Sequence, residues 1–190
     1  MIYRLTTKAT KQYLFLLLQR DGRLSRQHDV GLDLGCNRMQ NRPVFATRRY
    51  VGVDLDQAAL EAGKRKYPEA ETIHCSIDDH DKYPAGDFVV CVQVFSKHYS
   101  FDKAVPALVG VCDKVKKGGT LLINFGKKNM GELDAIRAVL RERFKTVDEV
   151  AYGISQKNSY LAPVVATLVY VLRLKPRTVQ KHYFRCQGRI

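Results

Sequence analysis

The sequence predicts a single α/β domain with a mostly parallel sheet, and three observations support this prediction. Its 190 residues suit one compact domain over 1–190 and leave no room for a second full one. Short apolar runs alternate with longer segments of helical spacing, as in successive β-α units. The stretch 87–94 is a nearly continuous apolar run, which is typical of a central parallel strand buried on both faces.

The predicted elements follow in order along the chain. A basic N-terminal segment, 1–28, contains an amphipathic helix at 8–20. The core, 29–173, is expected to contain strands at 29–34, 50–54, 71–75, 87–94, 120–125, 146–152 and 165–173, and helices at 57–66, 102–116 and 130–144. We expect the last two strands to form a closing hairpin around the loop 154–164, and the basic tail 174–190 to be partly disordered.

The positive charge of the chain is concentrated at its two ends. The net charge is +13; residues 1–50 hold 10 Lys/Arg against 3 Asp/Glu, residues 173–190 hold 6 against none, and the stretch between them sums to zero. Such ends favour an anionic substrate, RNA or the surface of an acidic membrane, although scattered charge can also serve solubility alone. The basic residues concerned are Lys8, Lys11, Arg20, Arg23 and Arg26 near the start, and Arg173, Lys175, Arg177, Lys181, Arg185 and Arg189 near the end.

The cysteines and the apolar runs of the sequence indicate in which cellular compartment the protein is located. The five cysteines are odd in number and include no C-x-x-C pair, so we predict no metal site and a reducing, cytoplasmic compartment. The apolar runs 13–18 and 161–172 are too short for a secretion signal or a bilayer span, so we predict no transmembrane segment. The sequence does not indicate an oligomeric state.

A glycine and several polar residues follow the first three strands, at the carboxyl ends where parallel α/β sheets bind nucleotides. Asp33 and Gly35 close the first strand, and Gly35 lets the backbone turn sharply and approach a ligand. Asp54 closes the second strand, where a carboxylate can accept two hydrogen bonds from ribose hydroxyls. The run 76–78 follows the third strand, where an adenine would lie between an apolar side chain and polar groups.

The loop after the first strand argues against a dinucleotide cofactor. In the dinucleotide pattern G-x-G-x-x-G, the glycine positions read Gly35, Asn37 and Gln40. A pyrophosphate cradle for NAD or FAD is therefore disfavoured, whereas a cofactor without phosphates tolerates the loss. The carboxylate of Asp33 also suits a ligand that carries an amino group and a sulfonium.

Four segments carry a resemblance to a known family, namely 32–36, 42–45, 50–54 and 116–123. The chain resembles the class I, type-11-like S-adenosylmethionine-dependent methyltransferases over roughly 29–125. The resemblance implies a three-layer Rossmann-like sandwich, with a seven-stranded, mostly parallel sheet whose last strand is antiparallel. It also implies S-adenosyl-L-methionine as methyl donor and S-adenosyl-L-homocysteine as product.

The resemblance assigns cofactor roles by position. Asp33 and Gly35 would line the methionine part, Asp54 would hold the ribose, and Ile77 and Asp78 would flank the adenine. Gln93 and Val94 would close the pocket after the fourth strand. The full expected cofactor set is Asp33, Gly35, Cys36, Asn37, Asp54, Leu55, Ser76, Ile77, Asp78, Gln93 and Val94.

The chain departs from the family pattern at two places. The second glycine of the loop is Asn37, the non-glycine type that best tolerates a positive φ, and a third is Met39. The common Leu-Glu-His after the fourth strand reads Phe-Ser-Lys at 95–97, with His98 one position later.

Methyl transfer is an in-line displacement at an activated carbon, so the protein mainly aligns donor and acceptor. A general base helps if the acceptor is a hydroxyl or a protonated amine. The candidate bases are His98, Asp79 and His80. Asp81 and Tyr99 are expected near the same mouth of the cofactor pocket. Alternatively, residues 79–81 form a solvated loop with no role in catalysis.

The predicted function is methyl transfer to an anionic small molecule, a glycan-lipid or a secondary metabolite. The alternatives are an RNA methyltransferase that uses the basic ends, and a catalytically silent binding protein that keeps the fold.

Overall fold

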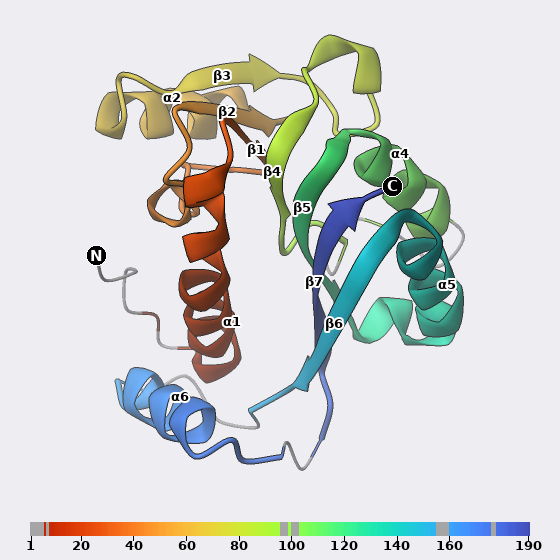
Figure 1. Ribbon diagram of the computed structural model, residues 1–190. Coiled ribbons are helices and arrows are strands. Elements are labelled where there is room, and N and C mark those ends of the chain that lie inside the picture. The colour runs from red at the N-terminus through yellow and green to blue at the C-terminus, as the bar shows by residue number, and fades with distance from the viewer. Residues whose placement is uncertain (1–5, 7, 96–98, 100–102, 155–159, 176–177) are drawn as a thin grey trace.

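The computed structural model describes residues 6, 8–95, 99, 103–154, 160–175 and 178–190, and it contains one seven-stranded sheet with helices on both faces (Figure 1). The strand order is β3-β2-β1-β4-β5-β7-β6. Strand β7 pairs antiparallel with both β5 and β6, and the other pairs are parallel. The predicted Rossmann-like sheet with an antiparallel last strand is confirmed.

Most predicted elements overlap the observed ones. The strands are β1 (Val30–Leu34), β2 (Arg49–Asp54), β3 (Glu71–His74), β4 (Gly86–Cys91), β5 (Val115–Gly126), β6 (Phe144–Tyr152) and β7 (Lys181–Arg189). The described α-helices are α1 (Ala9–Asp21), α2 (Gln57–Lys66), α4 (Ala104–Asp113), α5 (Leu133–Arg143) and α6 (Ala162–Val171).

The sheet is the middle of three layers. Val89 of β4 packs in a cluster with Leu108 of α4 and Ile136 of α5. The next residue, Val90, points to the opposite face and packs in a cluster with Leu14 of α1. Because successive strand residues face opposite sides, β4 is buried on both faces, as its apolar run predicts.

The predicted strand at 165–173 is wrong, because this run forms helix α6. The run is rich in β-branched residues, and short apolar runs do not distinguish strand from buried helix by periodicity. Pro163 lies in the first turn, where proline is well accommodated. Ala162 and Ala166 are one turn apart and pack together against Ala9 of α1, so tertiary packing favours the helix.

The prediction of a partly disordered tail at 174–190 is also wrong, because 181–189 forms strand β7 between β5 and β6. The side chains of Tyr183, Phe184 and Cys186 are fully buried. The closing hairpin therefore pairs β6 with β7, and α6 lies in the connection.

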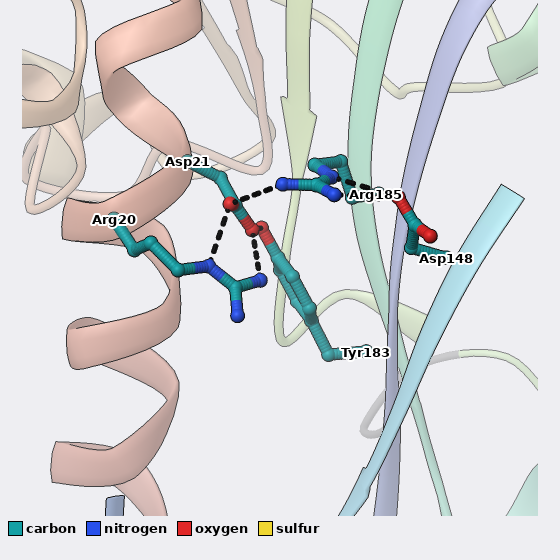
Figure 2. A network of polar contacts seen from close by, with 5 residues as sticks. All are labelled: Arg20, Asp21, Asp148, Tyr183 and Arg185. Atoms are coloured by element: carbon teal, nitrogen blue, oxygen red, sulfur yellow. Dashed lines mark hydrogen bonds and ion pairs between the residues drawn. The ribbon is translucent and has the colours of Figure 1, made fainter. Parts of the chain in front are cut away.

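A buried carboxylate at the end of α1 accommodates the charge of this basic strand (Figure 2). Asp21 is 1% exposed, and it accepts hydrogen bonds from Arg20, from Tyr183 Oη at 2.9 Å and from Arg185 at 3.1 Å. Arg185 also donates to Asp148 of β6 at 2.6 Å. The network ties α1 to the two closing strands and neutralises Arg185 within the fold.

Candidate functional site

A cavity of about 690 Å³ lies at the carboxyl ends of β1, β2, β3 and β4, and its size is in the range of ordinary ligand pockets. It is lined by Lys11, Gly35, Cys36, Asn37, Gln40, Asn41, Asp54, Leu55, Asp56, Cys75, Ser76, Ile77, Asp78, Val92, Gln93, Val94, Tyr99 and Lys103. Every residue of the expected cofactor set except Asp33 is among them.

Gly35 shapes the floor of the cavity where β1 ends. Its φ is +71°, a conformation that glycine adopts at little cost. Its N–H donates to the carbonyl of Val53 at 2.8 Å, and a Cβ on it would overlap Val94 Cγ2. The loop after β1 and the segment after β4 therefore approach closely here because residue 35 lacks a side chain.

Gly35→Ala is expected to lower the free energy of unfolding by about 1–3 kcal/mol, through the positive φ and the overlap with Val94. Urea titration measures this loss. Gly118→Ala is the matched control, because its φ of +78° gives similar strain while nothing lies within 4 Å of the added Cβ. A control loss as large as that of Gly35→Ala would show that the close approach to Val94 has no effect.

The loop keeps a glycine-like conformation at two non-glycine residues. Asn37 has a φ of +49° and Met39 a φ of +55°, the positions where the family pattern has glycine. The left-handed region costs a non-glycine residue roughly 1–2 kcal/mol. Met39 is fully buried and packs against Gly63 of α2. Packing of this side chain offsets the backbone strain, so a positive φ at position 39 does not require glycine.

Asp54 holds the loop and the start of α2 together. Its Oδ2 accepts from the N–H of Asn37 at 2.7 Å, and its Oδ1 accepts from the N–H of Asp56 at 2.9 Å. Asp56 in turn caps α2 by accepting from the N–H of Ala59 at 2.9 Å. A carboxylate has about four acceptor sites, so Asp54 keeps acceptor capacity for a ligand.

Asp33 lies behind the cavity and does not line it. It is fully buried, and its carboxyl accepts from Asn41 Nδ2 at 3.1 Å and from Tyr50 Oη at 2.9 Å. Burial raises the pKa of Asp33 to about 7, although the two hydrogen bonds act in the opposite direction. Asn41 does line the cavity, so Asp33 contacts the site through this amide.

Asp33→Asn is expected to remove a pH dependence of folding. The unfolded carboxyl ionises near its ordinary pKa of 3.8, whereas the folded one keeps its proton to about pH 7. The contribution of Asp33 to stability is therefore complete below pH 3.8 and declines by about 1.4 kcal/mol for each pH unit up to about 7. Urea titrations across this window compare the two proteins, and a stability difference that is constant with pH would contradict the assignment.

The segment after β3 presents apolar and polar groups side by side. Ile77 is buried, and Asp78 is exposed with its N–H donating to Ser76 Oγ at 3.2 Å. Tyr99 donates to Asp78 Oδ2 at 3.0 Å, and its ring stacks on Phe95 at 5.0 Å between centroids. Burial, and then the hydrogen bond to Asp78, raise the pKa of Tyr99, so this phenol stays protonated and acts as a donor.

A buried amide holds the segment after β4. Gln93 has a φ of +64°, and its N–H donates to Asn124 Oδ1 at 2.6 Å. Asn124 is fully buried and donates to Tyr152 Oη at 3.2 Å. The ring of Tyr152 stacks on Tyr13 of α1, with 5.5 Å between centroids. The strained backbone beside the cavity is thus fixed by β5, β6 and α1.

Asp79 and His80, two of the candidate bases, are not among the residues that line the cavity, whereas Tyr99 is. Asp79 accepts from Lys82 at 3.0 Å, and this pairing lowers the pKa of Asp79. His80 Nδ1 is 2.9 Å from Tyr83 Oη. His98 lies outside the described residues. No histidine among the described residues lines the cavity.

The cavity also contains residues that the sequence did not single out, namely Gln40, Asn41, Asp56, Cys75, Val92 and Lys103. Asp56 has a recognisable signal, because an aspartate directly before a helix is a typical N-cap. Lys103 comes from the start of α4, far along the chain, and no sequence pattern points to it. Lys103 and Lys11 of α1 are the two basic residues of the described lining, and they come from helices that pack on opposite faces of the sheet.

Comparison with known proteins identifies the same region. The sequence profile of a family described as "Methyltransferase domain" matches residues 32–123. The N-methyltransferase NodS from Bradyrhizobium japonicum WM9 has a similar structure, with a TM-score of 0.65, 13% sequence identity, and coverage of 94% of this chain and 97% of that one.

Two further structures are similar. A SAM-dependent methyltransferase from Archaeoglobus fulgidus has a TM-score of 0.61 and 14% identity, with 91% of this chain and 93% of that one covered. The plantazolicin methyltransferase BamL was solved with a triazolic desmethylPZN analog and SAH. It has a TM-score of 0.62 and 12% identity, with 95% of this chain and 86% of that one covered. A search of curated proteins found no match.

Proposed function

We propose that this chain is a class I S-adenosylmethionine-dependent methyltransferase and that it transfers a methyl group to an anionic small molecule. The methyltransferase profile over 32–123 covers every described residue of the cavity lining except Lys11. Bound S-adenosyl-L-methionine supplies a methyl group on a sulfonium, which is already activated for displacement. The residues of the chain then have to bind it, orient it and exclude water.

The volume and the donor set of the cavity support binding of this cofactor. We assign the ribose to Asp54, whose two oxygens keep acceptor capacity beside the loop that they hold. The adenine is assigned to Ile77 and Asp78, which offer an apolar surface next to a polar one. The methionine part is assigned to Gly35 and the loop after it. Asp33 is a positioning residue here, because it acts through Asn41.

The distribution of charge in the cavity is the observation that supports an anionic acceptor. The acidic lining residues, Asp54, Asp56 and Asp78, follow β2 and β3, where the nucleoside is assigned. The basic lining residues, Lys11 and Lys103, come from α1 and from the start of α4. A negatively charged acceptor is attracted to these two lysines and repelled by the three carboxylates, so we expect it to bind away from the ends of β2 and β3.

A methyl-transfer assay with matched acceptors tests this proposal. Amines and hydroxy compounds are offered with and without a carboxylate or phosphate, and transfer of labelled methyl is measured. We expect transfer to favour the anionic member of each pair, and Lys103→Gln to raise KM for it by about tenfold with kcat little changed. Lys145→Gln is the control, because Lys145 is exposed on β6 and is not among the residues that line the cavity. Equal transfer to charged and neutral members would overturn the anionic assignment.

RNA is the less favoured acceptor, because two arginines of the basic tail form ion pairs within the fold. Arg185 pairs with Asp21 and Asp148, and Arg189 pairs with Asp113. These cations are neutralised within the fold and do not form a free basic arm. RNA binding with a steep dependence on salt concentration would reverse this preference.

A further inference from the structure

Helix α6 exposes a continuous apolar surface. Leu161, Val164, Leu168, Val171 and Leu172 are each more than half exposed. Their spacing follows the helical period, so they form one stripe along the helix. Leu174 and Tyr160, at the two ends of the segment, extend it. Contiguous exposed apolar area of this kind marks an interaction site.

Helix α6 turns its small residues toward the protein and its larger apolar residues toward solvent, which is the opposite of a typical surface helix. Its small residues, Ala162 and Ala166, are fully buried against α1, whereas its larger aliphatic residues face outward. The helix has no charged residue, and Thr167 satisfies its hydroxyl by donating to the carbonyl of Pro163 at 2.8 Å. Figure 1 shows α6 beside the N-terminal end of α1 and away from the sheet. The outward stripe is therefore not required for packing of the core.

The surroundings of the stripe are basic and free of acid. No Asp or Glu follows Glu149 in the sequence, and none precedes Asp21. Arg173 and Lys175 are exposed directly after α6. A small hollow between α1 and α6, of about 300 Å³, is lined by Tyr170 together with Arg23 and with Arg20, whose guanidinium pairs with the buried Asp21. Apolar side chains with adjacent cations match the two components of an anionic lipid surface.

We propose that α6 docks onto an anionic lipid bilayer, with its apolar stripe inserted among the lipids and the flanking cations on the headgroups. A helix of ten residues is about 15 Å long, too short to span a bilayer, so it lies in the plane of the surface. No described helix is long and apolar enough to cross a membrane. A second copy of the chain fits the stripe less well, because pairing two such faces would bring like charges together.

Vesicle sedimentation tests the proposal with the full chain. Phosphatidylcholine vesicles are compared with vesicles that contain about 30% phosphatidylglycerol, at low and high salt. We expect binding to the anionic vesicles that weakens with salt. Leu168→Gln combined with Val171→Gln, and separately Arg173→Gln combined with Lys175→Gln, are each expected to lower the partition coefficient by about tenfold or more.

Ile190→Gln is the matched control. Ile190 is 61% exposed, and its N–H donates to the carbonyl of Arg143 at the end of α5, just before β6 begins, whereas α6 follows the end of β6. We expect this variant to bind vesicles like the wild type. Vesicle binding that is absent, or that is unchanged in the α6 double variant, would overturn the proposal. So would a dimer, measured by light scattering, that the α6 substitutions dissociate while vesicles do not bind.

Discussion

Asp54→Ala is expected to weaken binding of S-adenosyl-L-homocysteine by at least about 100-fold in calorimetry. The carboxylate is assigned two hydrogen bonds from ribose hydroxyls, and bonds to a charged group contribute about 1.5–3 kcal/mol each. The change also removes the acceptors of the Asn37 and Asp56 N–H groups, which hold the loop after β1 and the start of α2. Loss of ligand bonds and loss of loop order therefore act in the same direction.

Two further variants separate these causes. Asp54→Asn keeps one acceptor oxygen and the side-chain shape, so we expect an affinity between those of the wild type and Asp54→Ala. Glu61→Gln removes an exposed carboxylate from α2 and should leave the affinity unchanged. If Asp54→Ala bound the product as tightly as the wild type, the nucleoside would not lie at the end of β2.

Asp21→Ala is expected to lower the free energy of unfolding by about 3 kcal/mol, measured by urea titration. Removal of one member of a buried ion pair typically costs 3–5 kcal/mol, and the lower end of about 3 applies because Arg185 remains partly exposed. Tyr183 loses its acceptor in a fully buried position, which adds to the loss. Because the network joins α1 to β7, the substitution should also loosen α1.

Asp148→Ala is the control for the buried carboxylate. Asp148 is 46% exposed and pairs with the same arginine, which keeps Asp21 as a partner in this variant. We expect a loss of about 1 kcal/mol or less, as for other exposed ion pairs. A loss as large as that of Asp21→Ala would show that burial of Asp21 has no special effect.

The parallel half of the fold and most of the cavity could be predicted from the sequence. Each of Gly35, Asp54 and Ile77 follows a strand, and the carboxyl ends of parallel strands meet at one edge. Local order along the chain therefore gives their proximity in space. Asp33 shows the limit of this reasoning, because strand position did not reveal that its side chain lies behind the cavity.

The structure of the C-terminal part, α6 and β7, could not be predicted, because the fold of these residues depends on contacts with residues far away in the sequence. The basic character of 181–189 suggested a tail, whereas Asp21, more than 160 residues away, supplies the charge that lets Arg185 enter the sheet. The apolar run of α6 suggested a strand, and the alanines that pack on α1 decide for a helix. Lys103 reaches the cavity from a helix whose sequence has no cofactor signal.

A crystal structure of the complex with S-adenosyl-L-homocysteine tests the cofactor assignment most directly. We expect both ribose hydroxyls within hydrogen-bond distance of Asp54, the adenine beside Ile77 and Asp78, and the amino acid part along the loop after Gly35. A ligand bound elsewhere, or a ribose that does not contact Asp54, would contradict the account.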